Sequence, residues 1–277
     1  MPNQPTLLYS PLAKDVSSLP TDELRSHFLI ERIFLPGQIT MTFTDLDRMA
    51  VLGVQPAGGS PLKLDNVKQT GADFFLQRRE AGVINVGSPG VITVDGKSFP
   101  LANLDGLYIS MGSKDISFAG EGAKFYIIST PAHAPHPTTH IPKDQATPRP
   151  LGTQSTANVR KIYQYIHQGG VKSCQLVMGF TDLADGSVWN TMPPHTHTRR
   201  TEIYFYFDIP GDNVVAHFLG SPQSTRHLFV KNEQVALSPD YSIHCGCGTS
   251  NYKFIWAMGG ENQTFDDMDQ VQKQDLK

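Results

Sequence analysis

Short runs of β-branched and aromatic residues follow one another along most of the chain, and this pattern restricts the fold more than any other feature. The runs are rich in Val, Ile, Tyr and Phe, and Gly, Pro, Asp and Asn separate them at close spacing. They are TMTFT (40–44), GVINV (82–86), GVITVD (90–95), LYISM (107–111), KFYIIS (124–129), CQLVMGF (174–180), EIYFYF (202–207), NVVAHFL (213–219), RHLFV (226–230), QVALS (234–238) and YKFIWAM (252–258). Such a pattern indicates an all-β sandwich or closed barrel rather than alternating strands and helices.

Two segments have helical character. TDELRSHFL (21–29) places Thr21 at a predicted N-cap with acidic residues behind it, and DDMDQVQKQDL (266–276) predicts a short polar helix. Residues 129–150 are rich in proline and lack periodicity, which predicts a semi-rigid linker between two halves. Its histidines, His133, His136 and His140, have no predicted strand or helix to hold them as metal ligands.

Composition excludes several classes of protein. The chain has 277 residues, 39% of them hydrophobic, which suffices for a core of one or two domains. A net charge of −3 without a basic stripe argues against nucleic-acid and membrane-surface partners. We expect no signal peptide, and no apolar run approaches the ~18 residues of a membrane span.

The cysteines indicate a reducing compartment. There are three, Cys174, Cys245 and Cys247, and an odd number in a chain of this length does not make a disulfide framework. We therefore expect a cytoplasmic protein, in which the cysteines of the CGC pair are small apolar fillers.

The two halves of the chain resemble each other. Residues 78–96 align with 199–220, 104–118 with 232–246, and 123–129 with 252–258. Three matches in the same order indicate duplication of one β-domain. The first copy lacks the histidines of the second, and the alignment places Glu80 opposite Glu202.

The histidines of the second half form a candidate metal site. In HTHTRRTE, His195 and His197 lie two apart, so a strand points both the same way. The polar residues 198–201 can turn and return Glu202 to the same cavity, and His244 supplies a fourth ligand from a distant strand. Three imidazoles and a carboxylate suit Zn²⁺, Mn²⁺, Fe²⁺ or Ni²⁺. The alternative is a solvated turn in which Glu202 is a surface carboxylate.

These motifs carry a family resemblance. HTHTRRTE and PDYSIH resemble the two cupin motifs, with Tyr241 in the place of the usual glycine. Together with RREAGVINVG, ITVDG, FIWAMGGENQ and FDDMD, they make nearly the whole chain resemble the bicupin family of 5-keto-4-deoxyuronate isomerases (4-deoxy-L-threo-5-hexosulose-uronate ketol-isomerases).

The resemblance implies two tandem cupin (jelly-roll) domains with a few short helices. Residues 1–142 would form the copy without metal ligands, and residues 143–277 the copy with the metal and active site. It implies one zinc per chain, held by His195, His197, Glu202 and His244, and a homohexamer. The implied reaction converts 5-dehydro-4-deoxy-D-glucuronate to 3-deoxy-D-glycero-2,5-hexodiulosonate in pectin and hexuronate catabolism.

This reaction would move a proton between two carbons, most simply through a cis-enediol, and it needs a base. Glu202 is the nearest carboxylate, although it is also a ligand. Tyr206 shares its strand face and could relay a proton between oxygens, and Glu261 could reach the cavity mouth.

The carboxylate of such a substrate calls for an arginine. Arg199, between the ligands, and Arg226, at the start of a strand, are the candidates, with surface ion pairing as the alternative. Trp256 is expected to wall the pocket.

Three other functions remain open at this stage. The same ligands would serve an isomerase acting on 5-deoxyglucuronate or an iron-dependent cupin dioxygenase. The third is a sugar-binding cupin without turnover, although the sequence has no helical segment long enough for the DNA-binding motif that such sensors usually carry.

Overall fold

The computed structural model describes residues 4–146 and 148–277, and their contacts divide the chain into two compact units. Unit 1 contains residues 4–7, 33–146 and 165–177, and unit 2 contains residues 8–32, 148–164 and 178–277. Each unit is discontinuous in sequence: residues 8–32, for example, lie between two segments of unit 1 but belong to unit 2. The predicted boundary between residues 142 and 143 stays a prediction.

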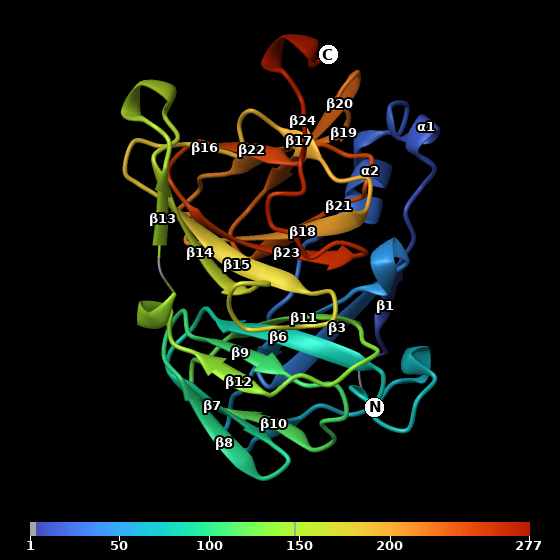
Figure 1. The fold of residues 1–277 in the computed structure, drawn as a ribbon, viewed down its shortest axis with the longest axis vertical. Helices are drawn as coiled ribbons and strands as arrows, with labels where there is room; N and C mark the ends of the chain where they lie inside the picture. Colours follow the sequence, from blue (N-terminus) through green and yellow to red (C-terminus); the bar gives the residue numbers. More distant parts are fainter. Residues whose placement is uncertain (1–3, 147) are drawn as a thin grey trace. The chain divides into compact units, whose positions relative to one another are not determined.

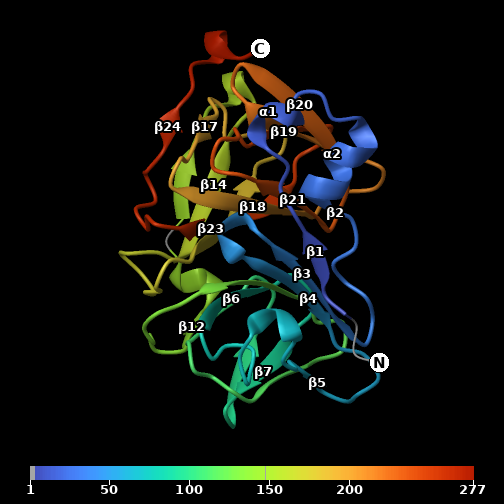
Figure 2. The ribbon, with the colours of Figure 1, turned by 90° about the vertical axis from the view of Figure 1, so that its right-hand side faces the viewer.

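Unit 1 consists of two β-sheets (Figures 1 and 2). The larger sheet has the order β1 (Thr6–Leu8), β3 (Gln38–Thr44), β4 (Ala50–Gln55), β11 (Phe125–Pro131), β6 (Arg79–Asn85), β9 (Gly106–Ile109) and β12 (Thr139–Ile141). The smaller sheet has the order β5 (Leu62–Lys63), β10 (Ile116–Ala119), β7 (Gly90–Val94) and β8 (Lys97–Leu101).

Unit 2 repeats this arrangement. Its larger sheet has the order β13 (Pro148–Leu151), β14 (Arg160–Ile166), β15 (Val177–Leu183), β23 (Lys253–Gly260), β18 (Arg200–Phe207), β21 (Gln234–Ser238) and β2 (Leu29–Ile30). Its smaller sheet has the order β16 (Trp189–Asn190), β22 (Cys245–Gly248), β19 (Val215–Ser221) and β20 (Ser224–Val230). A two-stranded sheet joins β17 (His195–Thr196) to β24 (Asp269–Gln270).

The strand orders confirm the duplication. The aligned segments hold β6 and β18, β9 and β21, and β11 and β23, and each pair occupies the same position in its sheet. The same holds in the smaller sheets for β7 and β19 and for β10 and β22. Two tandem barrels of cupin type therefore form from one repeated pattern of antiparallel strands, as predicted.

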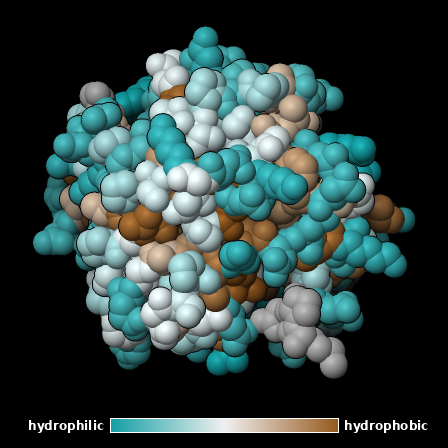
Figure 3. Space-filling view, turned by 90° about the horizontal axis from the view of Figure 1, so that it is seen from below, coloured by the Kyte–Doolittle hydropathy of each residue, from teal (hydrophilic) through white to brown (hydrophobic). Residues whose placement is uncertain are grey.

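The interior of the unit 1 barrel is apolar. Alternate residues of β6, Ala81 and Val83, belong to a core cluster with residues of the facing strands. Around this core, Ile39, Met41, Phe43, Leu62, Leu64 and Val67 are only partly buried. On the face drawn in Figure 3, hydrophobic residues reach the surface in groups among hydrophilic ones.

The alignment of Glu80 with Glu202 is wrong by one residue. Glu80 is fully buried but lies on the β6 face opposite to Ala81, and it accepts hydrogen bonds from the main-chain N–H groups of residues 174, 175 and 176 at 2.7–3.0 Å. The hydroxyls of Tyr108 and Thr130 also donate to it. Ala81 therefore occupies the interior position that Glu202 has in unit 2, so this barrel has no ligand there.

Helices are few and short. They are α1 (Ala13–Val16) and α2 (Thr21–Phe28), with 3₁₀ turns η1 (Leu46–Arg48), η2 (Lys68–Thr70), η3 (Lys143–Gln145), η4 (Gln154–Thr156) and η5 (Lys273–Asp275). The helix predicted at 21–29 is confirmed, but Thr21 is its first helical residue and the extended Pro20 is the N-cap. None of the helices in the described ranges is long and apolar enough to cross a membrane.

Two other predictions fail because edge pairing decides the local structure. The C-terminal segment is not an α-helix and contains only the 3₁₀ turn η5: β24 pairs with β17, and the N–H of Val271 donates to the carbonyl of Pro194 at 3.0 Å. A short polar segment has too little apolar face to hold a helix against such pairing. The proline-rich segment also contains two edge strands, β12 and β13, where prolines are tolerated.

Candidate metal centre

Four predicted ligands converge in unit 2. His195 lies on β17, His197 directly after it, Glu202 on β18 and His244 directly before β22. Residues 198 and 199 form the predicted turn, which the N–H of Arg200 closes by donating to the carbonyl of His197. The turn corrects the odd spacing between His197 and Glu202, so both side chains face one point.

The ligand atoms are close enough to share one ion. The Nε2 of His195 lies 3.1 Å from that of His197 and 3.0 Å from that of His244. An oxygen of Glu202 lies 2.9 Å from the Nε2 of His197 and 2.8 Å from that of His244. All four atoms lie within 4.8 Å of one another, and all four residues are buried.

Main-chain carbonyls fix the orientation of two imidazoles. The Nδ1 of His197 lies 2.6 Å from the oxygen of Asp267, and the Nδ1 of His244 lies 3.3 Å from the oxygen of Ser242. A carbonyl requires an N–H on the facing nitrogen, so the Nε2 atoms carry the lone pairs. Lone pairs and a carboxylate gathered in a buried space repel one another unless a cation lies between them. The donor set therefore fits a divalent metal ion.

The protonation states also suit a metal. Burial, with a smaller contribution from His244, lowers the pKa of His195 to about 2. Burial alone would raise the pKa of Glu202, but His244 and His197 outweigh it and hold that pKa well below its usual range. Neutral imidazoles beside an ionised carboxylate are the forms that coordinate a metal.

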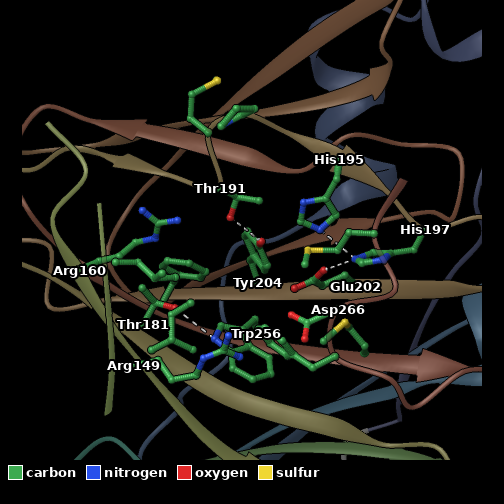
Figure 4. A pocket seen from close by; sticks show the side chains of 18 of the residues that line it. Arg149, Arg160, Thr181, Thr191, His195, His197, Glu202, Tyr204, Trp256 and Asp266 are labelled. Carbon is green, nitrogen blue, oxygen red and sulfur yellow. Dashed lines mark hydrogen bonds and ion pairs between the residues drawn. The ribbon is translucent and has the colours of Figure 1, made fainter. Parts of the chain in front are cut away.

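The cluster opens into a cavity of about 270 Å³, which lies within unit 2 (Figure 4). Its apolar walls include Ile162, Phe254, Trp256, Met258, Phe265 and Met268. Trp256 is held by a bond from its Nε1 to the hydroxyl of Thr181 at 3.1 Å. Gly179 makes room for it, since a Cβ there would lie 2.5 Å from the indole ring. The volume suits a small metabolite.

The other predicted site residues differ in whether they line the cavity. Trp256 lines it, as expected. Tyr206 is fully buried outside the lining, with its hydroxyl 2.7 Å from Nδ1 of His217, and the exposed Glu261 is also outside it. On the shared face of β18, Tyr204 reaches the cavity instead, and its hydroxyl lies 3.0 Å from that of Thr191.

Both predicted arginines lie outside the lining and are engaged elsewhere. Arg199 donates to both carboxylate oxygens of Asp267 at 2.6–3.1 Å and pairs with Asp269. Arg226 donates to the carbonyls of Val16, Ser17 and Leu19 at 2.8–2.9 Å, which ties the α1–α2 segment to β20. Neither arginine therefore has a guanidinium that is free to bind a substrate.

Three charged residues of the cavity escaped sequence reasoning. Arg149 lies on β13, Arg160 on β14, and Asp266 in the loop after β23. Arg149 and Asp266 belong to segments that were predicted as linker and helix, so no strand pattern indicated where their side chains point.

The chain has a family match and close relatives. A model of the KduI/IolB family matches residues 46–275. The 4-deoxy-L-threo-5-hexosulose-uronate ketol-isomerase of Opitutus terrae is 55% identical over 276 residues, which cover 98% of this chain and 99% of the relative. The protein of that name from Bacillus subtilis is 49% identical over 272 residues, covering 97% and 98%.

Solved structures show the same fold at low identity. An IolB-like protein from Salmonella typhimurium LT2 superimposes with a TM-score of 0.69 at 13% identity, covering 80% of this chain and 87% of that one. Oxalate decarboxylase from Bacillus subtilis gives a TM-score of 0.56 at 12% identity, covering 78% and 69%. With the family match over most of its length and full-length relatives near half identity, this chain belongs to the KduI/IolB family.

Proposed function

We propose that this protein is a metal-dependent aldose–ketose isomerase of hexuronate and pectin catabolism, converting 5-dehydro-4-deoxy-D-glucuronate to 3-deoxy-D-glycero-2,5-hexodiulosonate. The observation that carries the proposal is the buried cluster of three imidazoles and one carboxylate at the wall of a small cavity. Relatives at 48–55% identity named as ketol-isomerases support the choice of reaction.

Zinc is the metal that we assign to the four ligands, one per chain, with Fe²⁺, Mn²⁺ and Ni²⁺ distinguished by metal analysis. When bound, it would supply a Lewis acid that polarises the carbonyl and offsets negative charge on the substrate oxygens. The absence of a thiolate from the donor set favours a catalytic over a closed structural site.

Asp266 is the residue best placed to carry the proton between the two carbons. Its carboxylate lines the cavity on the side of Glu202 (Figure 4), and its side chain has no hydrogen-bond or ion-pair partner among the described residues. Glu202 shares the metal cluster with His197 and His244, so its carboxylate would be committed to the metal rather than free to act as a base. A carboxylate that removes a proton from one carbon to form the enediol and delivers it to the neighbouring carbon is sufficient for this route.

The hydroxyls of Tyr204 and Thr191 face the same cavity and bond to each other. Burial raises the pKa of Tyr204 well above its usual value, so the phenol stays protonated and can donate to a substrate oxygen. We therefore assign to Tyr204, at the cavity wall, the proton relay that the sequence predicted for Tyr206.

The reaction is tested by incubating the purified protein with 5-dehydro-4-deoxy-D-glucuronate in D₂O and following the products by NMR. The enediol route predicts the ketose with deuterium on the carbon that was the aldehyde. Ketose formed wholly without deuterium would indicate hydride transfer, or a carboxylate that returns the same proton before it exchanges with solvent. Oxygen uptake without isomerisation would support a dioxygenase, and binding without turnover would support a sensor.

The cellular location and the oligomeric state of the enzyme are also proposals. The free cysteines Cys174, Cys245 and Cys247 agree with a cytoplasmic location. Family resemblance suggests a homohexamer, in which the copy at residues 1–142, without the ligand set, would contribute to interfaces. Light scattering of the purified protein measures the assembly directly.

A further inference from the structure

The cavity holds a pair of positive charges that the metal cluster does not use. Arg149 and Arg160 both line it, on the edge strand β13 and its neighbour β14. Arg160 donates one hydrogen bond, from Nη1 to the carbonyl of Asn158 at 3.0 Å, and Arg149 lies over the ring of Phe265 at 5.7 Å. Among the described residues, no carboxylate pairs with either guanidinium.

The two arginines bind fewer groups of the protein than the other arginines nearby, and neither has a carboxylate partner among the described residues. Arg199 is neutralised by Asp267 and Asp269, and Arg200 donates to four main-chain carbonyls of the loop after β23. Arg160 is partly buried, and burial lowers its pKa because its charge lacks solvent. A desolvated guanidinium without a counter-ion is costly unless a ligand supplies the anion.

The sheet places this pair at a distance from the metal ligands. β15 and β23 lie between β14 and β18, and neighbouring strands are ~4.8 Å apart, so the backbones of Arg160 and Glu202 are separated by roughly 14 Å along the sheet. Figure 4 shows the arginines on one side of the cavity and His195, His197 and Glu202 on the other, with Tyr204 and Trp256 between. The arginine side chain spans part of this gap, and a six-carbon chain can span the rest.

We propose that Arg160, assisted by Arg149, binds the terminal carboxylate of the substrate and so positions the opposite, reacting end of the carbon chain at the metal cluster. The inference rests on the proposed function for the identity of the substrate. It also makes the arginine pair the feature that selects sugar acids over neutral sugars, since the walls between the two ends are largely apolar.

The test compares D-glucuronate with D-glucose, which differ in the carboxylate, as probes in calorimetric titrations of the metal-loaded protein. The wild type is expected to bind glucuronate at least ~30-fold more tightly than glucose, as for a charge-assisted bidentate pair. Arg160→Gln should lose at least ~10-fold of this preference, and Arg160→Lys should keep part of it. Lys161→Gln, the same charge change on the next, exposed residue of β14, should leave the preference unchanged.

The kinetic counterpart is a rise in KM for the keto-uronate that exceeds the fall in kcat, as expected for lost binding at a non-reacting end. If Arg160→Gln does not fold, the exposed Arg149→Gln carries the same test. An unchanged preference in both variants, or no preference in the wild type, would overturn the inference. The binding assay needs no turnover, so it reads the anion site even if the wild type fails to isomerise the keto-uronate.

Discussion

The Nδ1 atom of His197 lies 2.6 Å from the main-chain oxygen of Asp267, so the loop that follows β23 determines which nitrogen of this ligand faces the cluster. The same carbonyl accepts a hydrogen bond from Nη2 of Arg200 at 3.1 Å. Arg200 is 1% exposed and also binds the carbonyls of Asn262, Thr264 and Phe265. One guanidinium thus holds both the cavity loop and the orienting group of a ligand.

Arg200→Lys is therefore expected to lower the free energy of unfolding by about 3 kcal/mol and to weaken metal binding, because a lysine cannot serve four carbonyls. Arg199→Lys, on the neighbouring and more exposed residue, should cost much less, because solvent screens its ion pairs. Denaturant titrations and metal competition assays of both variants measure these effects. Equal stability losses in the two variants would show that Arg200 does not have this role.

Asp266→Asn tests the proposed base. Removing the carboxylate should lower kcat by about 10²–10⁴-fold while KM changes little and metal content is retained. Glu261→Gln is the matched variant, since Glu261 is exposed and does not line the cavity. Steady-state kinetics should show it within about twofold of the wild type. The opposite pattern would assign the role of base to Glu261, one of the candidates that the sequence offered.

His217, which is not one of the metal ligands, makes the free energy of unfolding depend on pH. Burial, with a smaller effect of His244, lowers its pKa to about 3, and it lies between the hydroxyls of Tyr206 and Ser238. Since the unfolded imidazole titrates near ~6.5, the unfolded chain binds more protons between that pH and pH 3. The stability contribution of this residue is fully present above pH ~6.5 and is lost as the pH falls towards 3.

Between pH 7 and pH 5 this histidine should account for about 2 kcal/mol of lost stability. His217→Gln keeps a polar partner for Tyr206 but cannot be protonated, so its free energy of unfolding should fall by correspondingly less over the same interval. Chemical denaturation at both pH values gives the difference directly. Identical pH dependence of variant and wild type would assign the acid sensitivity to other groups.

The sequence predicted the barrels and the ligand cluster because both follow from local periodicity. Alternation on strands predicted that His195 and His197 point the same way, and the polar turn after them predicted the return of Glu202. The same alternation put Tyr204 and Tyr206 on one face. Alternation does not tell how far along the strand the cavity extends, however, and of these two tyrosines only Tyr204 lines it.

The remaining cavity residues depend on edge pairing that has no periodic signal. Arg149 points to the cavity because Pro148–Leu151 adds to the edge of a sheet, and residues 266–270 approach the ligands because β24 pairs with β17. Arg199 and Arg226 were predicted from charge and position alone. Their actual partners, acidic residues of the C-terminal loop and carbonyls near the N-terminus, come from parts of the chain that no motif links to them.

The most direct measurement is the metal content of the purified protein by mass spectrometry, made together with the isomerisation assay before and after chelation. We predict about one zinc per chain, activity that disappears with a chelator and returns with zinc, and the loss of both metal and activity in His197→Ala. Full isomerase activity in metal-free protein would contradict the account, and stoichiometric iron with oxygen uptake would replace it with an oxidative chemistry.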